Sequence, residues 1–226
     1  CGNELEMPGC KYGIEDVLIA LEKGEIEESL LDESIERLLE LSKFTEQKEV
    51  KEFDKEAHNE LAKEASEKSA VLLENDGILP LKGTEKIAVV GDFAFKPRYQ
   101  GAGSSIVNPI MLTTAIEELK KSEFPAIFYC RGFERYGKKN KKLLKEAERI
   151  SGQAEVTLFF AGLDEYSEAE GIDRKDMKIP ENQIEVFKDL IKARRKVVLI
   201  LHCGSSVELD WTEGAAAVLW LGLSGQ

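Results

Sequence analysis

Five short apolar runs alternate with amphipathic stretches between residues 86 and 222, and this alternation constrains the fold more than any other feature. The runs are IAVVG (87–91), AIFYC (126–130), VTLFFAG (156–162), VVLILHCG (197–204) and AAVLWLG (216–222). Most are continuously apolar, which is typical of parallel strands that are covered on both faces. Helical spacing is seen between them, in residues 109–122, 139–150 and 180–195. The order predicts an α/β fold with a mostly parallel, doubly wound sheet.

Residues 1–75 have a different pattern, which predicts an N-terminal helical extension. Apolar residues recur at helical spacing in three segments, 13–26, 28–44 and 48–75. Asn75, Asp76 and Gly77 then break the pattern. We therefore expect two domains, a helical one over 1–75 and an α/β sandwich over 76–226. The second ends directly after the last predicted strand, so we expect it to be truncated, with an exposed sheet edge and apolar face that favour a homo-oligomer.

Charge and cysteine content restrict the partners. The net charge of −12 argues against nucleic acid and anionic membranes, which both need a cationic surface. No apolar run approaches the roughly 20 residues of a membrane span. The four cysteines have no CxxC spacing, and Cys130 and Cys203 end apolar runs, where a free thiol acts as a small hydrophobe. A reducing, cytoplasmic setting without structural zinc is the prediction.

The sequence predicts neither a cofactor nor a metal site. The glycines of GAGS begin ten residues after Gly91, whereas a dinucleotide fingerprint places them at the end of the strand. This spacing argues against a nucleotide-dependent enzyme. An EF-hand that starts at Asp164 has its glycine and glutamate out of register. His202 ends an apolar run and is expected to be a core or rim residue whose polar atoms are satisfied.

The segment EYSEAEGIDR (165–174) concentrates four acids around one glycine, at the end of the third apolar run. Ligands of open α/β sheets bind at the carboxyl ends of the strands, so this loop is expected on the functional rim. Like-charged neighbours raise the pKa of a carboxyl group, and a protonated glutamic acid can act as a general acid. The alternative is a solvated acidic turn balanced by Arg174 and Lys175. Charge alone leaves both readings open.

Several stretches, taken in order, resemble glycoside hydrolase family 3. They are LLDESIERLLEL (30–41), the segment from ASEKSAVLLEN to VVGDFA (65–94), GAGSSIVNP (101–109), GLDEYSEAEGIDRKDMKIPENQ (162–183), GSSVELDW (204–211) and LGLSGQ (221–226). The resemblance covers nearly the whole chain. It implies part of a retaining β-glycosidase that hydrolyses terminal β-linked glucose or xylose. In such enzymes a barrel aspartate is the nucleophile, and a glutamate of the second domain is the acid/base, about 5–5.5 Å away.

The resemblance also implies roles for residues of this chain. Glu168 is the first choice for the acid/base and Glu170 the second. A weaker implication is that Gly103, Ser104 and Ser105 contact the substrate. Asp173 and Arg174 would form an ion pair that fixes the return of the loop.

One departure from the family pattern limits the expected activity. The nucleophile motif SDW is absent, and the only DW, at Asp210 and Trp211, lies in the other domain. Residues 1–75 then correspond to the helical tail of a missing barrel domain and to linker helices. We expect the barrel of the same protein and a carbohydrate as partners, and no activity from the chain alone. The alternative is a non-catalytic carbohydrate-contacting or interaction module of the same fold.

Overall fold

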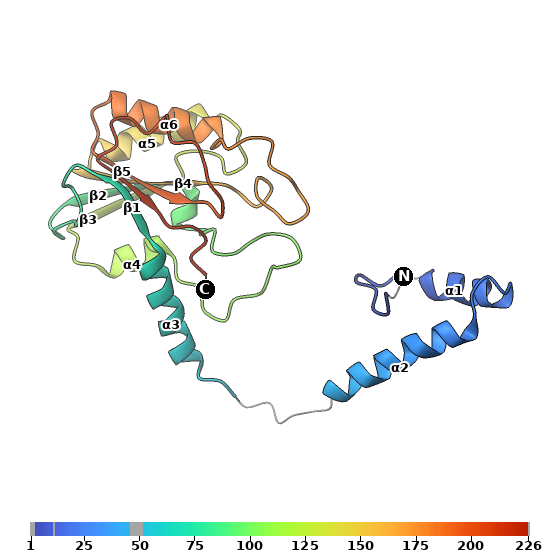
Figure 1. The fold of residues 1–226 in the computed structure, drawn as a ribbon. Helices are drawn as coiled ribbons and strands as arrows, with labels where there is room; N and C mark the ends of the chain where they lie inside the picture. The colour runs from blue at the N-terminus through green and yellow to red at the C-terminus, as the bar shows by residue number, and fades with distance from the viewer. Residues whose placement is uncertain (1–2, 11, 46–51, 226) are drawn as a thin grey trace. The chain divides into compact units, whose positions relative to one another are not determined.

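The computed structural model describes residues 3–10, 12–45 and 52–225. The chain forms two compact units, Cys1–Phe53 and Asp54–Gln226 (Figure 1). None of the helices in the described ranges combines the length and the apolar composition that a bilayer crossing requires.

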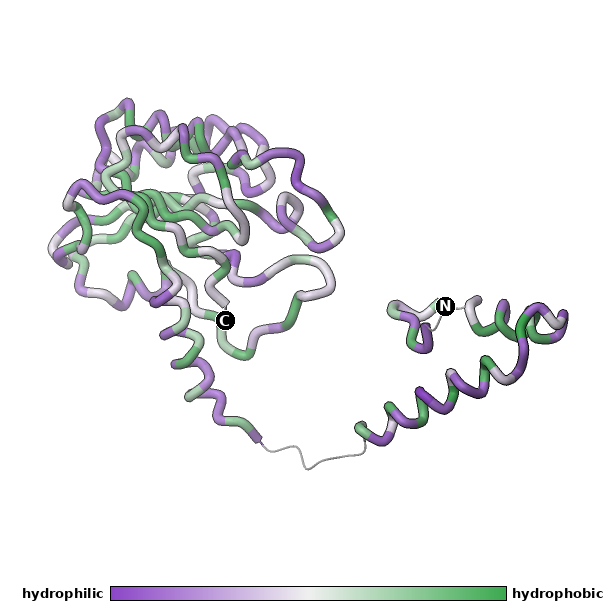
Figure 2. Tube along the Cα trace, in the orientation of Figure 1, coloured by the Kyte–Doolittle hydropathy of each residue, from purple (hydrophilic) through white to green (hydrophobic). Residues whose placement is uncertain are grey.

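The N-terminal unit contains two helices, α1 (Gly13–Glu22) and α2 (Glu28–Phe44), as its spacing predicted. Gly24, with φ of 68°, turns the chain between them in a conformation that favours glycine. Hydropathy alternates along α2 (Figure 2), yet neither helix has a buried residue. Leu30 and Leu39 are more than half exposed. The amphipathic pattern therefore makes helices here without forming a core.

The second unit begins with α3 (Lys55–Ser69), which starts where Asp54 Oδ1 accepts hydrogen bonds from Glu56 N and Ala57 N. This is an N-cap, the favoured role of aspartate at a helix start. The prediction that the helix continues to residue 75 is wrong. Residues Val71–Asn75 form strand β1, which pairs antiparallel with β6 (Ala217–Trp220). A partner strand that is distant in sequence overrides the local helical spacing.

The sheet has six strands in the order β1-β6-β5-β4-β2-β3. The strands not yet introduced are β2 (Lys86–Val90), β3 (Ala126–Cys130), β4 (Val156–Gly162) and β5 (Val197–His202). Every pair is parallel except β1 with β6. Each of the five predicted runs contains a strand, and β4 is buried along its whole length. The predicted α/β class with a mostly parallel sheet is confirmed.

Helices cover both faces of the sheet, as a doubly wound fold requires. Figure 1 shows α5 (Lys141–Ser151) and α6 (Glu181–Lys192) on one face and α4 (Ala115–Lys121) on the other. Helix α4 is shorter than the predicted segment 109–122, because Thr114 and Glu117 form a capping box that begins the helix there. Between α6 and the sheet, Phe187 is fully buried. Burial of one such side chain contributes ~1.5–3 kcal/mol.

The turn after β2 shows how tightly the rim of the sheet is built. Gly91 has φ of 126°, and a Cβ atom there would lie 2.1 Å from the carbonyl oxygen of Phe160 in β4. Only glycine fits this close approach. The chain then enters the short 3-10 helix η1 (Asp92–Ala94), which places Asp92 at the carboxyl end of the strand.

Candidate functional site at the carboxyl rim

The acids of the loop after β4 do not crowd against one another. Three of the four acids bind different partners: Glu165 binds Arg135, Glu168 binds Gly204 and Ser205, and Glu170 binds Ser104. The sequence predicted mutual repulsion, which would raise the pKa values of these carboxyl groups. The structure instead distributes the charge onto cations and N–H or O–H donors.

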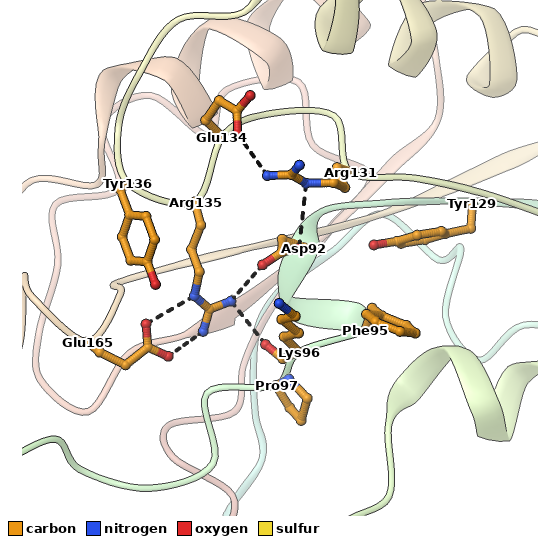
Figure 3. Close-up of a pocket in the computed structure, with 10 residues that line it drawn as sticks. All are labelled: Asp92, Phe95, Lys96, Pro97, Tyr129, Arg131, Glu134, Arg135, Tyr136 and Glu165. Carbon is orange, nitrogen blue, oxygen red and sulfur yellow. Dashed lines mark hydrogen bonds and ion pairs between the residues drawn. The ribbon is translucent and has the colours of Figure 1, made fainter.

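The pKa of Glu165 is lowered, whereas the sequence predicted a raised pKa. Burial is the largest single influence and would raise its pKa. The hydrogen bonds from the Arg135 guanidinium at 3.0 and 2.5 Å, a backbone hydrogen bond, and the charges of Arg135 and Arg98 together outweigh burial and lower the pKa. Asp92 binds the same guanidinium at 3.1 Å (Figure 3). A cation beside a carboxylate favours the ionised form of that carboxylate. Glu165 is therefore a partner of a buried arginine and not a proton donor at neutral pH.

Glu168 lies at the carboxyl ends of β4 and β5, as predicted for a rim residue. Its Oε2 accepts a hydrogen bond from Gly204 N at 2.9 Å, and its Oε1 accepts one from Ser205 Oγ at 2.5 Å. Its side chain is 16% exposed. Only Cys203 separates the end of β5 from Gly204 and Ser205, so the carboxylate is held by the loop that directly follows this strand. The Glu168 carboxylate is thus both accessible to solvent and fixed in orientation.

Arg98 holds the backbone of this loop through hydrogen bonds, and the sequence analysis did not predict this role. Its Nη1 donates to the carbonyls of Leu163 and Asp164, and its Nη2 donates to the carbonyl of Glu168 at 2.7 Å. Its Nε donates to the carbonyl of Gln100. Arg98 is only 2% exposed, so its charge is compensated by these carbonyls and by Glu168 Oε2 at 3.7 Å. Its partners in the acidic loop lie 65 to 70 residues away, which no local pattern reveals.

Glu170 joins the acidic loop to the glycine-rich loop. Its backbone N–H donates to the carbonyl of Ala102, and its Oε2 accepts from Ser104 N, both at 3.0 Å. Gly103, with φ of 96°, packs so closely that a Cβ atom would lie 2.9 Å from Glu170 Cβ. Glu170 therefore connects two loops through both its backbone and its side chain.

Arg174 contacts the loop after β5. Its Nη1 donates to Ser205 Oγ and to the carbonyl of Ser206, both at 2.8 Å. The ion pair predicted between Asp173 and Arg174 is not among the ion pairs formed by the described residues, and Asp173 is exposed. Ser205 thus receives a hydrogen bond from Arg174 and donates one to Glu168.

These loops enclose an open cavity of about 530 Å³. Glu168, Glu170 and Arg174 line it together with Ser205, and Ser105 is the one lining residue among the three small residues predicted to contact substrate. Gly103 and Ser104 lie against Glu170 instead. In the described ranges, no group of histidine, cysteine and acidic side chains could hold a metal ion. The cavity therefore offers carboxylate and guanidinium chemistry.

His202, at the end of β5, differs from its prediction. It was expected to have satisfied polar atoms, but neither ring nitrogen has a hydrogen-bond partner within the described structure. The ring stacks on Phe93 at 6.2 Å and on Phe160 at 5.9 Å between centroids. Burial, helped by the nearby charge of Arg135, lowers the pKa of His202 to about 4. The imidazole is therefore a neutral core residue.

The fold and the site together define an α/β domain that holds carboxylates at the carboxyl rim of a parallel sheet. Comparison identifies its family: the model of the glycosyl hydrolase family 3 C-terminal domain matches residues 70–226. The chain belongs to glycoside hydrolase family 3, which confirms the resemblance seen in the sequence.

Named relatives are longer than this chain. Thermostable beta-glucosidase B of Acetivibrio thermocellus is 38% identical over 234 residues, which cover 100% of this chain and 31% of that protein. Exo-alpha-(1->6)-L-arabinopyranosidase of Bifidobacterium breve is 34% identical over 240 residues, with coverages of 100% and 31%. The probable exo-1,4-beta-xylosidase bxlB of Aspergillus terreus is 27% identical over 175 residues, with coverages of 74% and 22%. The chain spans about a third of the length of the first two relatives.

A solved structure has the same fold. The GH3 beta-glucosidase of Bifidobacterium adolescentis superposes with a TM-score of 0.72 and 33% sequence identity. The match covers 94% of this chain and 32% of that one. The similarity therefore extends to almost all of this chain and to one part of a larger glycosidase.

Proposed function

We propose that this chain supplies the acid/base residue of a retaining β-glycosidase that acts on terminal β-linked glucose or xylose, and that Glu168 is that residue. The observation that carries the proposal is the position of the Glu168 carboxylate, which lines the open rim cavity and is held by Gly204 N–H and Ser205 O–H. Glu170 lines the same cavity but is engaged as the connection between two loops. The names of the relatives support the substrate class.

The hydrogen bonds of Glu168 support a proposal for which of its oxygens is protonated in the acid form. Oε2 faces Gly204 N–H, which can only donate, so a proton on this oxygen would cost that bond. Oε1 faces the hydroxyl of Ser205, which can reverse its role and accept. Arg174 already donates to this hydroxyl and leaves a second lone pair for the proton of Glu168. The acid form of Glu168 therefore carries its proton on Oε1.

In the proposed reaction, Glu168 first donates this proton to the oxygen of the leaving group and later accepts a proton from water. A retaining mechanism also needs a nucleophilic carboxylate about 5–5.5 Å away across the glycosidic bond. The family resemblance assigns that group to a barrel domain. The partner of this chain is therefore a barrel domain of the same protein, which would complete the sugar pocket.

The test replaces each glutamate in a protein that joins this chain to its barrel domain. Glu168→Ala should lower kcat for alkyl and sugar leaving groups by about 10²–10⁴-fold, the usual contribution of a general acid. Aryl leaving groups of low pKa should be less affected in the first step, and azide should partly restore turnover by forming a β-glycosyl azide. Glu170→Ala is the matched control.

Two results would reject the assignment. If Glu168→Ala is silent while Glu170→Ala lowers kcat and responds to azide, Glu170 is the acid/base. If both variants hydrolyse all substrates like the wild type, the chain is instead a non-catalytic carbohydrate-contacting or interaction module.

A further inference from the structure

A chain of two hydrogen bonds runs from Arg174 through Ser205 to the proposed acid/base. Arg174 Nη1 donates to Ser205 Oγ at 2.8 Å, and Ser205 Oγ donates to Glu168 Oε1 at 2.5 Å. Glu168 and Arg174 belong to the acidic loop after β4, and Ser205 belongs to the loop after β5. All three residues line the rim cavity. The two loops therefore meet at one carboxylate oxygen.

Arg174 fixes the direction of this chain of hydrogen bonds. A guanidinium can only donate, so Ser205 Oγ accepts from Arg174 and cannot donate to it. The hydroxyl has a single hydrogen, which is left for Glu168 Oε1. Hydrogen bonds in series polarise one another, so the contact with Arg174 also strengthens the donation to Glu168. Arg174 thereby acts on the carboxylate through the serine.

The position of Arg174 is set by the segment that carries Ser205. The same Nη1 atom donates to the carbonyl of Ser206 at 2.8 Å. The Nη2 atom of Arg174 is buried and has no hydrogen-bond partner among the residues that the structure describes. A buried donor without a partner costs stability, and departures of this kind are typical of functional sites. The arrangement indicates a residue that serves the site rather than the stability of the fold.

The Glu168 carboxylate lies directly against the backbone of the loop after β5. A Cβ atom at Gly204 would lie 3.2 Å from both Cδ and Oε1 of Glu168. Gly204 N also donates to Oε2 at 2.9 Å. One oxygen is therefore held by a backbone N–H that only donates, and the other by a hydroxyl that can either donate or accept. Only the contact with Ser205 can change direction when Glu168 gains or loses a proton.

We propose that Ser205 and Arg174 are positioning residues for Glu168, and that they act in the step in which Glu168 gives up its proton. The inference rests on the proposed role of Glu168 as the acid/base. In this step the glycosidic C–O bond breaks and its electron pair goes to the leaving oxygen, which receives the proton of Glu168. The barrel nucleophile bonds to the anomeric carbon, and the negative charge left on Glu168 faces Ser205.

Ser205 favours the charged form of Glu168 over the neutral form. Its hydroxyl accepts from the protonated acid and donates to the carboxylate. The second of these hydrogen bonds involves an ion, and such bonds are roughly twice as strong as neutral ones. Carboxylate charge develops as the proton leaves, so the contact is stronger in the transition state than in the ground state. An interaction of this kind raises kcat and not only the affinity for substrate.

Kinetics of the chain joined to its barrel domain test the pair. Ser205→Ala should lower kcat for alkyl and phenyl β-glucosides by about 10–100-fold, the effect of one hydrogen bond to a charged group. It should change kcat little for 2,4-dinitrophenyl β-glucoside, whose leaving group departs without a proton. Ser205→Thr keeps the hydroxyl and should recover most of the loss. Arg174→Met should lower kcat in the same pattern, whereas Lys175→Met, at the exposed cation beside it, should not.

A double-variant cycle separates this role from a merely structural one. In a Glu168→Ala background, Ser205→Ala should cause no further loss of kcat, because the hydroxyl acts only through Glu168. The inference is overturned if Ser205→Ala is silent, if it slows all leaving groups equally, or if its effect remains in full without the Glu168 carboxylate.

These outcomes are distinct from a failure of the proposed function. If Glu168→Ala lowers kcat while Ser205→Ala and Arg174→Met do not, only the positioning role is rejected. If Glu168→Ala is silent, the acid/base assignment is rejected, and the positioning role is rejected with it.

Discussion

Arg98 binds Glu168 twice: its Nη2 donates to the Glu168 carbonyl at 2.7 Å, and its Nη1 lies 3.7 Å from Oε2 of the same residue. The same guanidinium binds the carbonyls of Leu163 and Asp164, where the acidic loop leaves β4. One buried side chain therefore fixes both the start of the loop and the backbone of its central glutamate. The position of the proposed acid/base therefore depends on a buried residue that lies outside the acidic loop.

Replacement of Arg98 should destabilise the second unit. Arg98→Met leaves buried carbonyls without donors, and we expect the free energy of unfolding to fall by about 3–5 kcal/mol. Urea unfolding followed by the fluorescence of Trp211 and Trp220, which both lie in this unit, measures the loss. Arg149→Met, at an exposed position of α5, should change stability by less than about 0.5 kcal/mol. Equal effects of the two substitutions would contradict the role given to Arg98.

Gly91→Ala should destabilise more than a substitution at another left-handed glycine. Both Gly91 (φ 126°) and Gly77 (φ 101°) have positive φ, which by itself costs alanine about 1–3 kcal/mol. At Gly91 the new Cβ would also lie 2.1 Å from Phe160 O, whereas nothing lies within 4 Å at Gly77. Urea midpoints of the two variants give the difference. If Gly77→Ala lowers the free energy of unfolding as much as Gly91→Ala, the close contact between Gly91 and β4 does not add to the destabilisation.

Acid should destabilise the fold through His202. Burial lowers its pKa from 6.5 to about 4 in the folded protein, so the unfolded chain binds this proton more readily. Stability should be complete above pH ~6.5 and should fall as the pH drops toward about 4, by a total of ~3 kcal/mol from this group. His202→Phe, which keeps a ring between Phe93 and Phe160, should reduce this fall, as measured by urea unfolding at pH 7 and pH 5.

The control for the acid effect is Arg149→Met, which changes an exposed residue of α5 and leaves both histidines in place. This variant should retain the wild-type difference between pH 7 and pH 5. An unchanged pH dependence in His202→Phe would show that other groups govern the acid response.

The thiols of Cys130 and Cys203 should be inert in the folded protein. Both are buried and free, as the apolar runs predicted, and burial raises each pKa to about 12. The thiolate is the reactive form, so almost no thiolate should be present to react with an aromatic disulfide reagent at pH 8. In a variant with Cys1→Ser and Cys10→Ser, the coloured thiolate product of the reagent should form only after urea unfolding. Rapid reaction of this variant in buffer alone would show that the strand ends open.

The isolated chain should not hydrolyse glycosides. It holds the proposed acid/base, while the family resemblance assigns the nucleophile to the barrel, and loss of one carboxylate of a retaining pair removes the covalent route. Release of 4-nitrophenol from 4-nitrophenyl β-glucoside and β-xyloside measures this, with the chain joined to its barrel as the positive control. Turnover by the isolated chain that Glu168→Gln abolishes would mean that a nucleophile is present within these residues.

The sequence by itself determined the layers of the second unit. Strands such as β4 and β5, and helices such as α6, were predicted because burial on both faces or on one face leaves a periodic apolar pattern in the chain. The family resemblance came from short motifs that are recognisable without knowledge of their tertiary contacts. Periodic patterns and short motifs are local properties, so consecutive residues are enough to identify them.

Only the tertiary structure decided which groups meet. Strand β1 was predicted as helix, because its partner β6 lies about 145 residues away, and the pairing leaves no local signature. The same is true of Arg98 under Glu168 and of Arg135 between Asp92 and Glu165. A hydrogen bond or an ion pair depends on the distance between two atoms, and chain composition does not set that distance. The electrostatics of the rim therefore follow from the fold.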